Sequence, residues 1–258
     1  FVVSNFRNDL YVVLLSKKGL IKRINLSSFP VVRRSKPICA LKLVNDDELV
    51  SIAETSGNSD LFLASVDGKA VFYNENEIIV TNPKTGGIKA ASFKGSECAG
   101  LLSFLPDEKS KIALITNRGA TRVFDTSHIE RSQRLSKATV IFNMFQKEPH
   151  RLVYVGKIGD KSAPFSYDAV LEDASRIDVT FQDFYLTPME KYVKRPESFP
   201  FKARIAEVSE EDTLLINSST PSFAPPVKEE PKEQEEAEKE NSFEQISLFD
   251  VDPSDEKK

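Results

Sequence analysis

The sequence predicts an all-β, propeller-like fold built from four-stranded blades. Three hairpins recur along the chain, and each joins two apolar strands through a polar residue and a glycine, at Gly19, Gly68 and Gly119. These glycines are 49 and 51 residues apart. A period of about fifty residues is typical of one β-rich unit stacked on copies of itself. We therefore expect the function to lie on an assembled surface rather than in one catalytic pocket.

The hairpin turns are the clearest local signal. A tight hairpin turn needs a residue with positive φ, and glycine takes that conformation without steric cost. A second apolar half follows each hairpin and reaches an alanine 21, 22 and 19 residues after the glycine, at Ala40, Ala90 and Ala138. Two hairpins in each period of about fifty residues predict four strands per blade.

The repeat weakens beyond residue 157. Residues 152–155 and 177–181 are still predicted as strands, and 199–208 is a further candidate. None of them has the turn glycine that is followed, three residues later, by a basic residue. We predict one repeat domain over residues 1–217, with clear repeats in 1–157 and degenerate blade material in 158–217. Its first residue enters partway into a strand, which predicts that the domain is incomplete at its N-terminus.

Residues 218–258 differ in composition from the repeats. They contain several prolines and a Glu- and Lys-rich stretch, which bury too little apolar surface to fold alone. We predict a disordered acidic tail here.

The net charge of −4 hides a division along the chain. Residues 1–150 carry 21 Lys and Arg against 15 Asp and Glu, whereas residues 221–258 carry 5 against 12. Charge acts locally, within a Debye length of about 10 Å, so the repeats behave as a basic body and the tail as an acidic one.

Cations recur in register with the glycines, and equivalent positions of stacked blades lie at similar radius and height. They therefore predict a basic stripe on the rim, which suits the regularly charged backbone of duplex DNA. Val71 stands where Lys22 and Arg122 stand in the other copies, so the second blade is expected to grip DNA less. Ordinary surface charge is the alternative reading. The candidate DNA-binding residues are Lys17, Lys18, Lys22, Arg23, Arg33, Arg34, Lys36, Lys89, Arg118, Arg122, Arg131, Arg134 and Lys137.

No pattern of catalytic or metal-binding residues stands out. His128 and His150 lack partners at metal-ligand spacing, and no nucleotide-binding or hydrolase motif is present. The acidic run 46–48 reads as a solvated loop rather than a Mg²⁺ site. We expect no catalytic residue, metal or cofactor in this chain.

The two cysteines, Cys39 and Cys98, lie in apolar runs without metal-ligand spacing, which favours a reducing cytoplasmic compartment. No apolar run approaches the roughly 20 residues of a membrane span. We expect a cytoplasmic, nucleoid-associated protein, and the sequence leaves peripheral membrane contact open.

Several segments together resemble the C-terminal domain of the A subunit of bacterial type IIA topoisomerases, especially topoisomerase IV of the Gram-positive type. The resemblance covers roughly residues 1–157 and rests on the whole repeat pattern rather than on one motif. The segments that carry it are Gly19-Leu-Ile-Lys22-Arg23, Arg33-Arg34-Ser35-Lys36, Asp46-Asp47-Glu48-Leu49-Val50, Gly86-Gly87-Ile88-Lys89-Ala90, Gly119-Ala-Thr-Arg122 and Pro149-His150-Arg151.

That resemblance implies a β-pinwheel, in which four-stranded blades exchange strands with their neighbours and DNA bends around a basic outer rim. It implies that the catalytic tyrosine lies in a region preceding this domain, so this chain alone is expected not to cut DNA. It also implies partners, namely a second copy of the A polypeptide and the ATPase B subunit, in a holoenzyme that uses ATP and Mg²⁺ elsewhere.

Two other readings stay open at this stage. The equivalent domain of gyrase usually carries a QRRGGRG-like box, which this sequence lacks. A propeller-like protein-interaction scaffold with no DNA role is the alternative from a different functional class.

Overall fold

The computed structural model describes residues 3, 6–29, 37–143, 149–158, 165–181, 199–200 and 202–209. The chain divides into two units, Phe1–Ser219 and Thr220–Lys258, and every described residue lies in the first. Predictions for the tail and for Arg33, Arg34 and Lys36 therefore fall outside the described residues.

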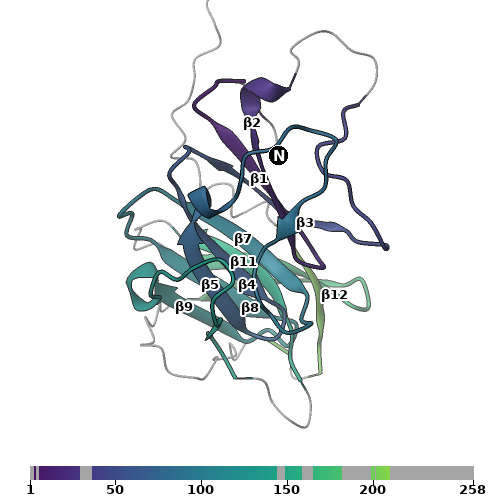
Figure 1. Cartoon of the computed structure of the whole chain (residues 1–258). Coiled ribbons are helices and arrows are strands. Elements are labelled where there is room, and N and C mark those ends of the chain that lie inside the picture. The colour runs from purple at the N-terminus through teal and green to yellow at the C-terminus, as the bar shows by residue number, and fades with distance from the viewer. Residues whose placement is uncertain are drawn as a thin grey trace, which may run out of the picture. The chain divides into compact units, whose positions relative to one another are not determined.

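The described part of the chain contains β-strands and short 3-10 helices and no α-helix (Figure 1). The strands are β1 (Tyr11–Ser16), β2 (Leu20–Asn25), β3 (Leu49–Thr55), β4 (Asp60–Ser65), β5 (Lys69–Asn74), β6 (Ile88–Lys89), β7 (Cys98–Phe104), β8 (Lys111–Thr116), β9 (Thr121–Asp125), β10 (Thr139–Val140), β11 (Leu152–Ile158), β12 (Phe165–Leu171), β13 (Arg176–Phe181) and β14 (Ile205–Ser209). The 3-10 helices are η1 (Leu26–Ser28), η2 (Glu75–Glu77) and η3 (Thr126–His128).

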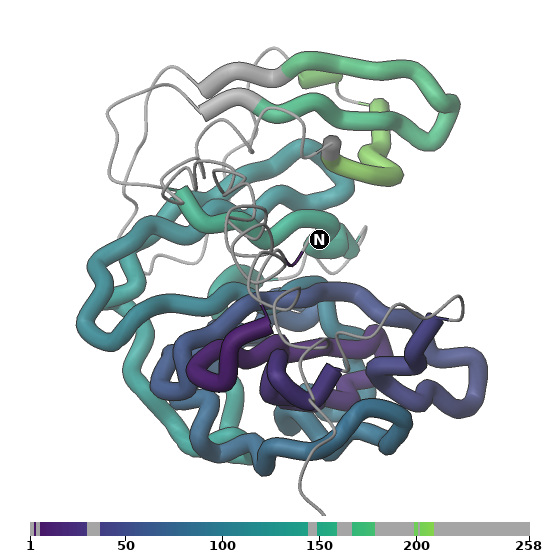
Figure 2. The backbone as a smooth tube through the Cα atoms, turned by 90° about the horizontal axis from the view of Figure 1, so that it is seen from above, coloured from purple at the N-terminus to yellow at the C-terminus, as the bar shows by residue number. Residues whose placement is uncertain are grey.

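The strands form four antiparallel sheets, with orders β3-β1-β2-β6, β10-β5-β4-β7, β11-β8-β9 and β13-β12-β14. We call these sheets blades 1 to 4. Each is built around one hairpin, and the hairpins follow one another along the tube of Figure 2 from purple to green. The first two sheets are four-stranded, which confirms the predicted blade.

The fourth strand of a blade comes from the next repeat. Strand β6 follows the second hairpin but pairs with β2 of blade 1, where Lys89 lies opposite Leu20. Strand β10 follows the third hairpin but pairs with β5 of blade 2, where Val140 lies opposite Lys69. The strand exchange implied by the resemblance is therefore present. The expectation that each repeat supplies both hairpins of its own blade is wrong, because these strands cross to the preceding blade.

The three turn glycines have φ values of +88°, +78° and +72°, as the hairpin pattern predicts. Each donates its N–H to the carbonyl three residues earlier, as from Gly19 to Ser16 at 3.1 Å. Blade 4 has the same turn without glycine, since Ala174 has φ +64° and donates to Leu171 at 2.9 Å. The missing glycine explains why β12, ahead of this turn, was not predicted.

Among the described residues, three hydrophobic cores lie between successive blades, and a fourth covers the other face of blade 1, around Leu14 and Ile24. Side chains alternate between the two faces of a strand, and both faces of β4 pack on a neighbour, so all six of its residues are buried. This burial explains its continuous apolar run. The three inter-blade cores bring together residues of neighbouring blades, such as Leu15 with Leu63, Phe62 with Leu114, and Ile115 with Tyr167.

Backbone hydrogen bonds repeat the same connection from blade to blade. In each case the first residue of β7, β11 or β14 donates its N–H to a carbonyl in the hairpin turn of the preceding blade. The bonds run from Cys98 to Lys17, from Leu152 to Val66 and from Ile205 to Asn117, at 2.8, 2.9 and 2.7 Å.

The exchanged strands also fix the repeat register. Ala90 donates its N–H to the carbonyl of Gly19 at 2.8 Å, and Ile141 donates to that of Gly68 at 2.8 Å. Ile141 is therefore the equivalent of Ala90, and both lie 22 residues after their own glycine. The predicted equivalence of Ala138 and Ala90 is wrong by three residues.

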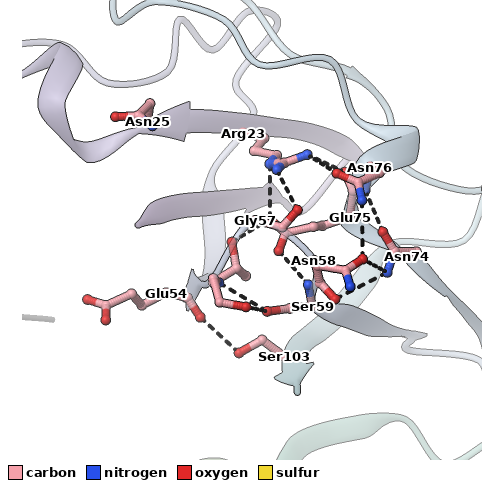
Figure 3. A network of polar contacts seen from close by, with 12 residues as sticks. Arg23, Asn25, Glu54, Gly57, Asn58, Ser59, Asn74, Glu75, Asn76 and Ser103 are labelled. Carbon is pink, nitrogen blue, oxygen red and sulfur yellow. Dashed lines mark hydrogen bonds and ion pairs between the residues drawn. The ribbon is translucent and has the colours of Figure 1, made fainter. Parts of the chain in front are cut away.

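A buried polar network joins blade 1 to the helix η2 that follows β5 (Figure 3). Arg23 Nε lies 2.9 Å from Glu75 Oε2, and the two side chains are only 6% and 0% exposed. The carboxylate also accepts hydrogen bonds from Thr55 Oγ1 at 2.5 Å and from the Ser59 N–H at 2.6 Å.

The guanidinium of Arg23 is equally well partnered. It donates to the carbonyls of Gly57 and Glu75, both at 3.1 Å, and to Asn76 Oδ1 at 3.0 Å. It also lies 4.3 Å from the centre of the Tyr11 ring. Arg23 Nε itself makes no hydrogen bond, so its contact with Glu75 is an ion pair only. A buried ion pair surrounded by such hydrogen bonds is the kind that the interior of a protein tolerates.

Candidate nucleic-acid interface

Each blade has an inner and an outer side. The strands at one side of the sheets contact each other from blade to blade, β3 with β7, β7 with β11 and β11 with β14. The short strands β6 and β10 lie at the opposite side of blades 1 and 2. We define the outer edge as segments 37–42, 78–92 and 129–140, which contain β6, β10 and the chain next to them.

The first two of these segments run side by side. Lys42 donates its N–H to the Thr85 carbonyl at 3.0 Å, and Lys84 donates to the Cys39 carbonyl at 2.8 Å.

The outer edge is strongly basic. Its three segments contain six cations and one acid, Glu130, and one further exposed acid, Glu77, lies directly before the second segment. All six are exposed except Arg134, which is half-buried. The cations are Lys42, Lys84, Lys89, Arg131, Arg134 and Lys137.

Contacts between successive repeats bring three of the predicted residues together. Arg134 donates a guanidinium hydrogen bond to the carbonyl of Lys89, and its own N–H donates to Glu77 Oε2 at 2.6 Å. Lys137 pairs with Ser92 in a parallel bridge three residues beyond Lys89. These contacts place Lys89, Arg134 and Lys137 in one basic patch.

Arg131 has a partner of its own. Its guanidinium forms an ion pair with the carboxylate of Asp60, which is 2% exposed while the arginine side chain is 54% exposed. Part of the Arg131 charge therefore compensates a buried acid.

Lys17, Lys18 and Arg118 lie elsewhere, in the hairpin turns. The turn edge comprises turns 16–19, 65–68, 116–119 and 171–175 with the adjoining loops 44–48, 94–97, 149–151 and 202–204. It carries seven basic and seven acidic residues. Lys17 Nζ lies 3.2 Å from Glu48 Oε2, and the N–H of Lys18 donates to Asp47 Oδ1 at 2.8 Å. The acidic run 46–48 thus lies against the first turn, where Glu48 forms an ion pair with Lys17.

Two other predicted residues are buried. Lys22 is 1% exposed and donates to the carbonyls of Ala40 and Thr85, at 2.7 and 3.0 Å. Arg122 is 3% exposed and donates to the carbonyl of Ile141. Burial lowers the pKa of both side chains from their ordinary values. Assigning them to a DNA-contacting rim is wrong, because both side chains point inward and donate hydrogen bonds to backbone carbonyls of neighbouring segments.

Arg23 is wrongly assigned for the same reason, since it is 5% exposed within the Glu75 network. The inference drawn from Val71 fails with them. Val71 is a core residue that is 2% exposed. Blade 2 therefore lacks the buried side-chain hydrogen bonds that Lys22 and Arg122 make in the other blades, and it loses no phosphate contact at this position.

We expect Lys22→Met to lower stability without changing any salt dependence of DNA binding. The variant takes the Lys22 donor from the Ala40 carbonyl, while the Thr85 carbonyl keeps the Lys42 N–H, so we expect a loss of about 1–3 kcal/mol from the one group left unsatisfied. Urea unfolding checks the first part and a salt titration of binding the second. Lys109→Met, at an exposed position outside the outer edge, is the control and should stay within about 0.5 kcal/mol. A shallower salt slope in Lys22→Met would restore Lys22 to the interface.

Two exposed cations of the outer edge, Lys42 and Lys84, are not among the DNA-binding residues predicted from the sequence. The sequence contained a signal for Lys84, since it lies in the loop that leads to the predicted strand containing Lys89. Within the described ranges no group of three or more His, Cys, Asp or Glu side chains is arranged to hold a metal ion. In the same ranges no helix has the length and apolar character needed to cross a membrane.

The blades match a known family. The model described as "DNA gyrase C-terminal domain, beta-propeller" matches residues 10–56 and 59–103, which correspond to the repeats of blades 1 and 2. Over these two segments the chain is similar to this family. Each matched segment begins at a hairpin and ends with an inner strand. This unit is the covalent repeat of the domain.

Curated relatives and solved structures agree with this assignment. The A subunit of DNA topoisomerase 4 from Bacillus subtilis (strain 168) is 29% identical over 151 residues, which are 58% of this chain and 19% of that protein. The chain thus spans about a fifth of the length of the curated relatives it matches. The resemblance to the A subunit of topoisomerase IV is confirmed.

Two solved structures share the fold. One, a crystal structure of the C-terminal domain of DNA topoisomerase IV, has a TM-score of 0.71 at 21% identity and covers 84% of this chain and 67% of that one. A structure of the DNA gyrase A C-terminal domain has a TM-score of 0.63 at 16% identity and covers 80% and 67%. These matches confirm the predicted β-pinwheel.

Proposed function

We propose that this chain binds duplex DNA along the outer edge and bends it. The observation that carries the proposal is the charge imbalance of that edge, six cations against one acid, beside a turn edge in which charges cancel. Cations on neighbouring blades can contact phosphates along one duplex, and such contacts need no base readout. The patch at Lys89, Arg134 and Lys137 is the proposed centre of the interface.

The bend requires compensation. Smoothly bending a site of 20–30 base pairs costs on the order of 1–6 kcal/mol, so several phosphate contacts must form together. Strand exchange supports this role, because β6, which contains Lys89, and β10, which follows Lys137 in the chain, pair with the preceding blade and hold these two cations on a fixed framework.

We further propose that the domain is the non-catalytic part of the A polypeptide of a topoisomerase IV. There it would present a DNA segment for strand passage during decatenation and relaxation of the chromosome, in the cytoplasm at the nucleoid. The proposed partners are a second copy of the A polypeptide and the ATPase B subunit. The similarity to the topoisomerase 4 relatives supports this placement over the gyrase alternative.

The test is a gel shift of the whole chain with duplex DNA across a salt series. If all six cations of the outer edge neutralise phosphates, the logarithm of the affinity should fall with the logarithm of salt at a slope of roughly −5. Duplexes of different sequence should bind about equally. A flat salt dependence, or no binding at low salt, would favour the protein-interaction scaffold instead.

A further inference from the structure

Large apolar side chains are exposed among the cations of the outer edge. Ile79, Val80, Leu135 and Val140 are 73%, 43%, 49% and 52% exposed. Leaving such side chains in water forgoes the stabilisation that burial gives, and an exposed apolar group within a charged surface marks a contact site. These four residues lie on the segments that we propose contact DNA.

The repeat register shows that cations and apolar side chains occupy equivalent places. Thr81 and Ser132 both donate their N–H to the central hairpin of the preceding blade, to Arg23 and Phe72 respectively, and they are 51 residues apart. The same offset relates Ala90 to Ile141, which confirms one constant register across the edge.

In that register, two exposed lysines of the second repeat have apolar equivalents in the third. Lys84 corresponds to Leu135, and Lys89 corresponds to Val140. All four side chains are exposed. A DNA backbone that passes the two lysines would therefore meet Leu135 and Val140 at the equivalent places one blade later.

Of Leu135 and Val140, Leu135 has the position better suited to entering a groove of the duplex. It lies in a turn closed by the Ser136 N–H on the Gln133 carbonyl at 3.0 Å, directly after Arg134 and two residues before Lys137. An apolar side chain at the tip of a turn, flanked by cations, can reach base pairs while its neighbours contact phosphates. DNA-bending proteins use such wedges to unstack one base step from the minor groove.

We propose that Leu135 is an apolar wedge that enters the minor groove and kinks the duplex. This inference rests on the proposed function, and it adds a fixed bend point to an otherwise smooth wrap. Pyrimidine–purine steps unstack most easily, so the wedge should sit at a TA or CA step.

The experiment measures the bend and the affinity separately. A duplex of about 40 base pairs, with one central TA step and dyes at its ends, reports the bend by energy transfer in the saturated complex. Leu135→Ser should lower the bend angle by at least about 20°, the smallest kink that such wedges produce, and leave the salt slope unchanged. Leu105→Ser is the matched control, because Leu105 is 58% exposed and lies outside the outer edge.

A second variant tests the position of Leu135. Leu135→Lys places the cation of its equivalent, Lys84, at the same turn, so the salt slope should steepen by about 0.9 while the bend falls. An unchanged bend in both variants, with DNA still bound, overturns the wedge and leaves the proposed function intact. An unbound wild-type chain overturns the proposed function itself.

Discussion

Replacing Lys89, Arg134 and Lys137 together by alanine is expected to weaken DNA binding severely. The three residues form one patch across two repeats, through the Arg134 bond to the Lys89 carbonyl and the bridge between Lys137 and Ser92. Losing three phosphate contacts should flatten the salt slope by about 2.7 and lower affinity about 10²–10³-fold at 0.1 M salt. Binding isotherms at several salt concentrations measure both quantities.

The matched control removes the same number of charges from the turn edge, with Lys17, Lys18 and Arg118 changed to alanine. Acidic neighbours already neutralise the first turn, as Glu48 does for Lys17 at 3.2 Å. The salt slope of this control variant should therefore change by less than about 0.9, the value of one phosphate contact. Equal losses in the two triple variants would mean that DNA does not distinguish the two edges.

Glu75→Ala is expected to give the largest loss of stability. It leaves the guanidinium of Arg23 buried without its carboxylate, and breaking a buried pair in this way costs about 3–5 kcal/mol. Such a loss is a large share of the roughly 5–15 kcal/mol that stabilises a typical native protein. Urea unfolding measures it, with Glu54→Ala, at an exposed position on β3, as the control expected within about 0.5 kcal/mol.

A double variant separates the pair from its surroundings. Changing both Arg23 and Glu75 to methionine removes both charges and keeps apolar volume, so no buried charge is left unpaired. This double variant should be more stable than Glu75→Ala alone. If the double variant is the less stable of the two, the pair contributes more than the cost of burying its charges.

The repeat, the turn glycines and the all-β class were all predictable, because hairpin turns impose local demands that the sequence displays. Strands β6 and β10 were harder, since two residues carry no measurable alternation. Their partners also lie in another repeat, and nothing local to Thr139 points to Ala70. The three-residue error at Ala138 arose from matching residue type where only hydrogen bonding defines equivalence.

The candidate site was predicted only in part. Lys22 and Arg122 recur in register with glycine, and sequence alone does not distinguish a cation that faces solvent from one that caps buried carbonyls. The flanking residues offered a partial signal, since Lys22 lies among strongly apolar strand positions. Lys89, Arg134 and Lys137 lie in short or irregular segments, where a charged side chain has little core to enter, and they reach the surface, as Lys18 and Arg131 also do.

Strand exchange has a consequence for how such proteins change size during evolution. A gene duplication copies the covalent repeat, which is one hairpin, the outer strand of the preceding blade and the inner strand of its own blade. The copied unit therefore carries both a strand to donate and a site to receive one, and it is complementary to itself. Adding or losing one repeat leaves every remaining junction of the same kind, so the length of the outer edge, and of the DNA that we propose it binds, would change by whole blades without a new kind of interface.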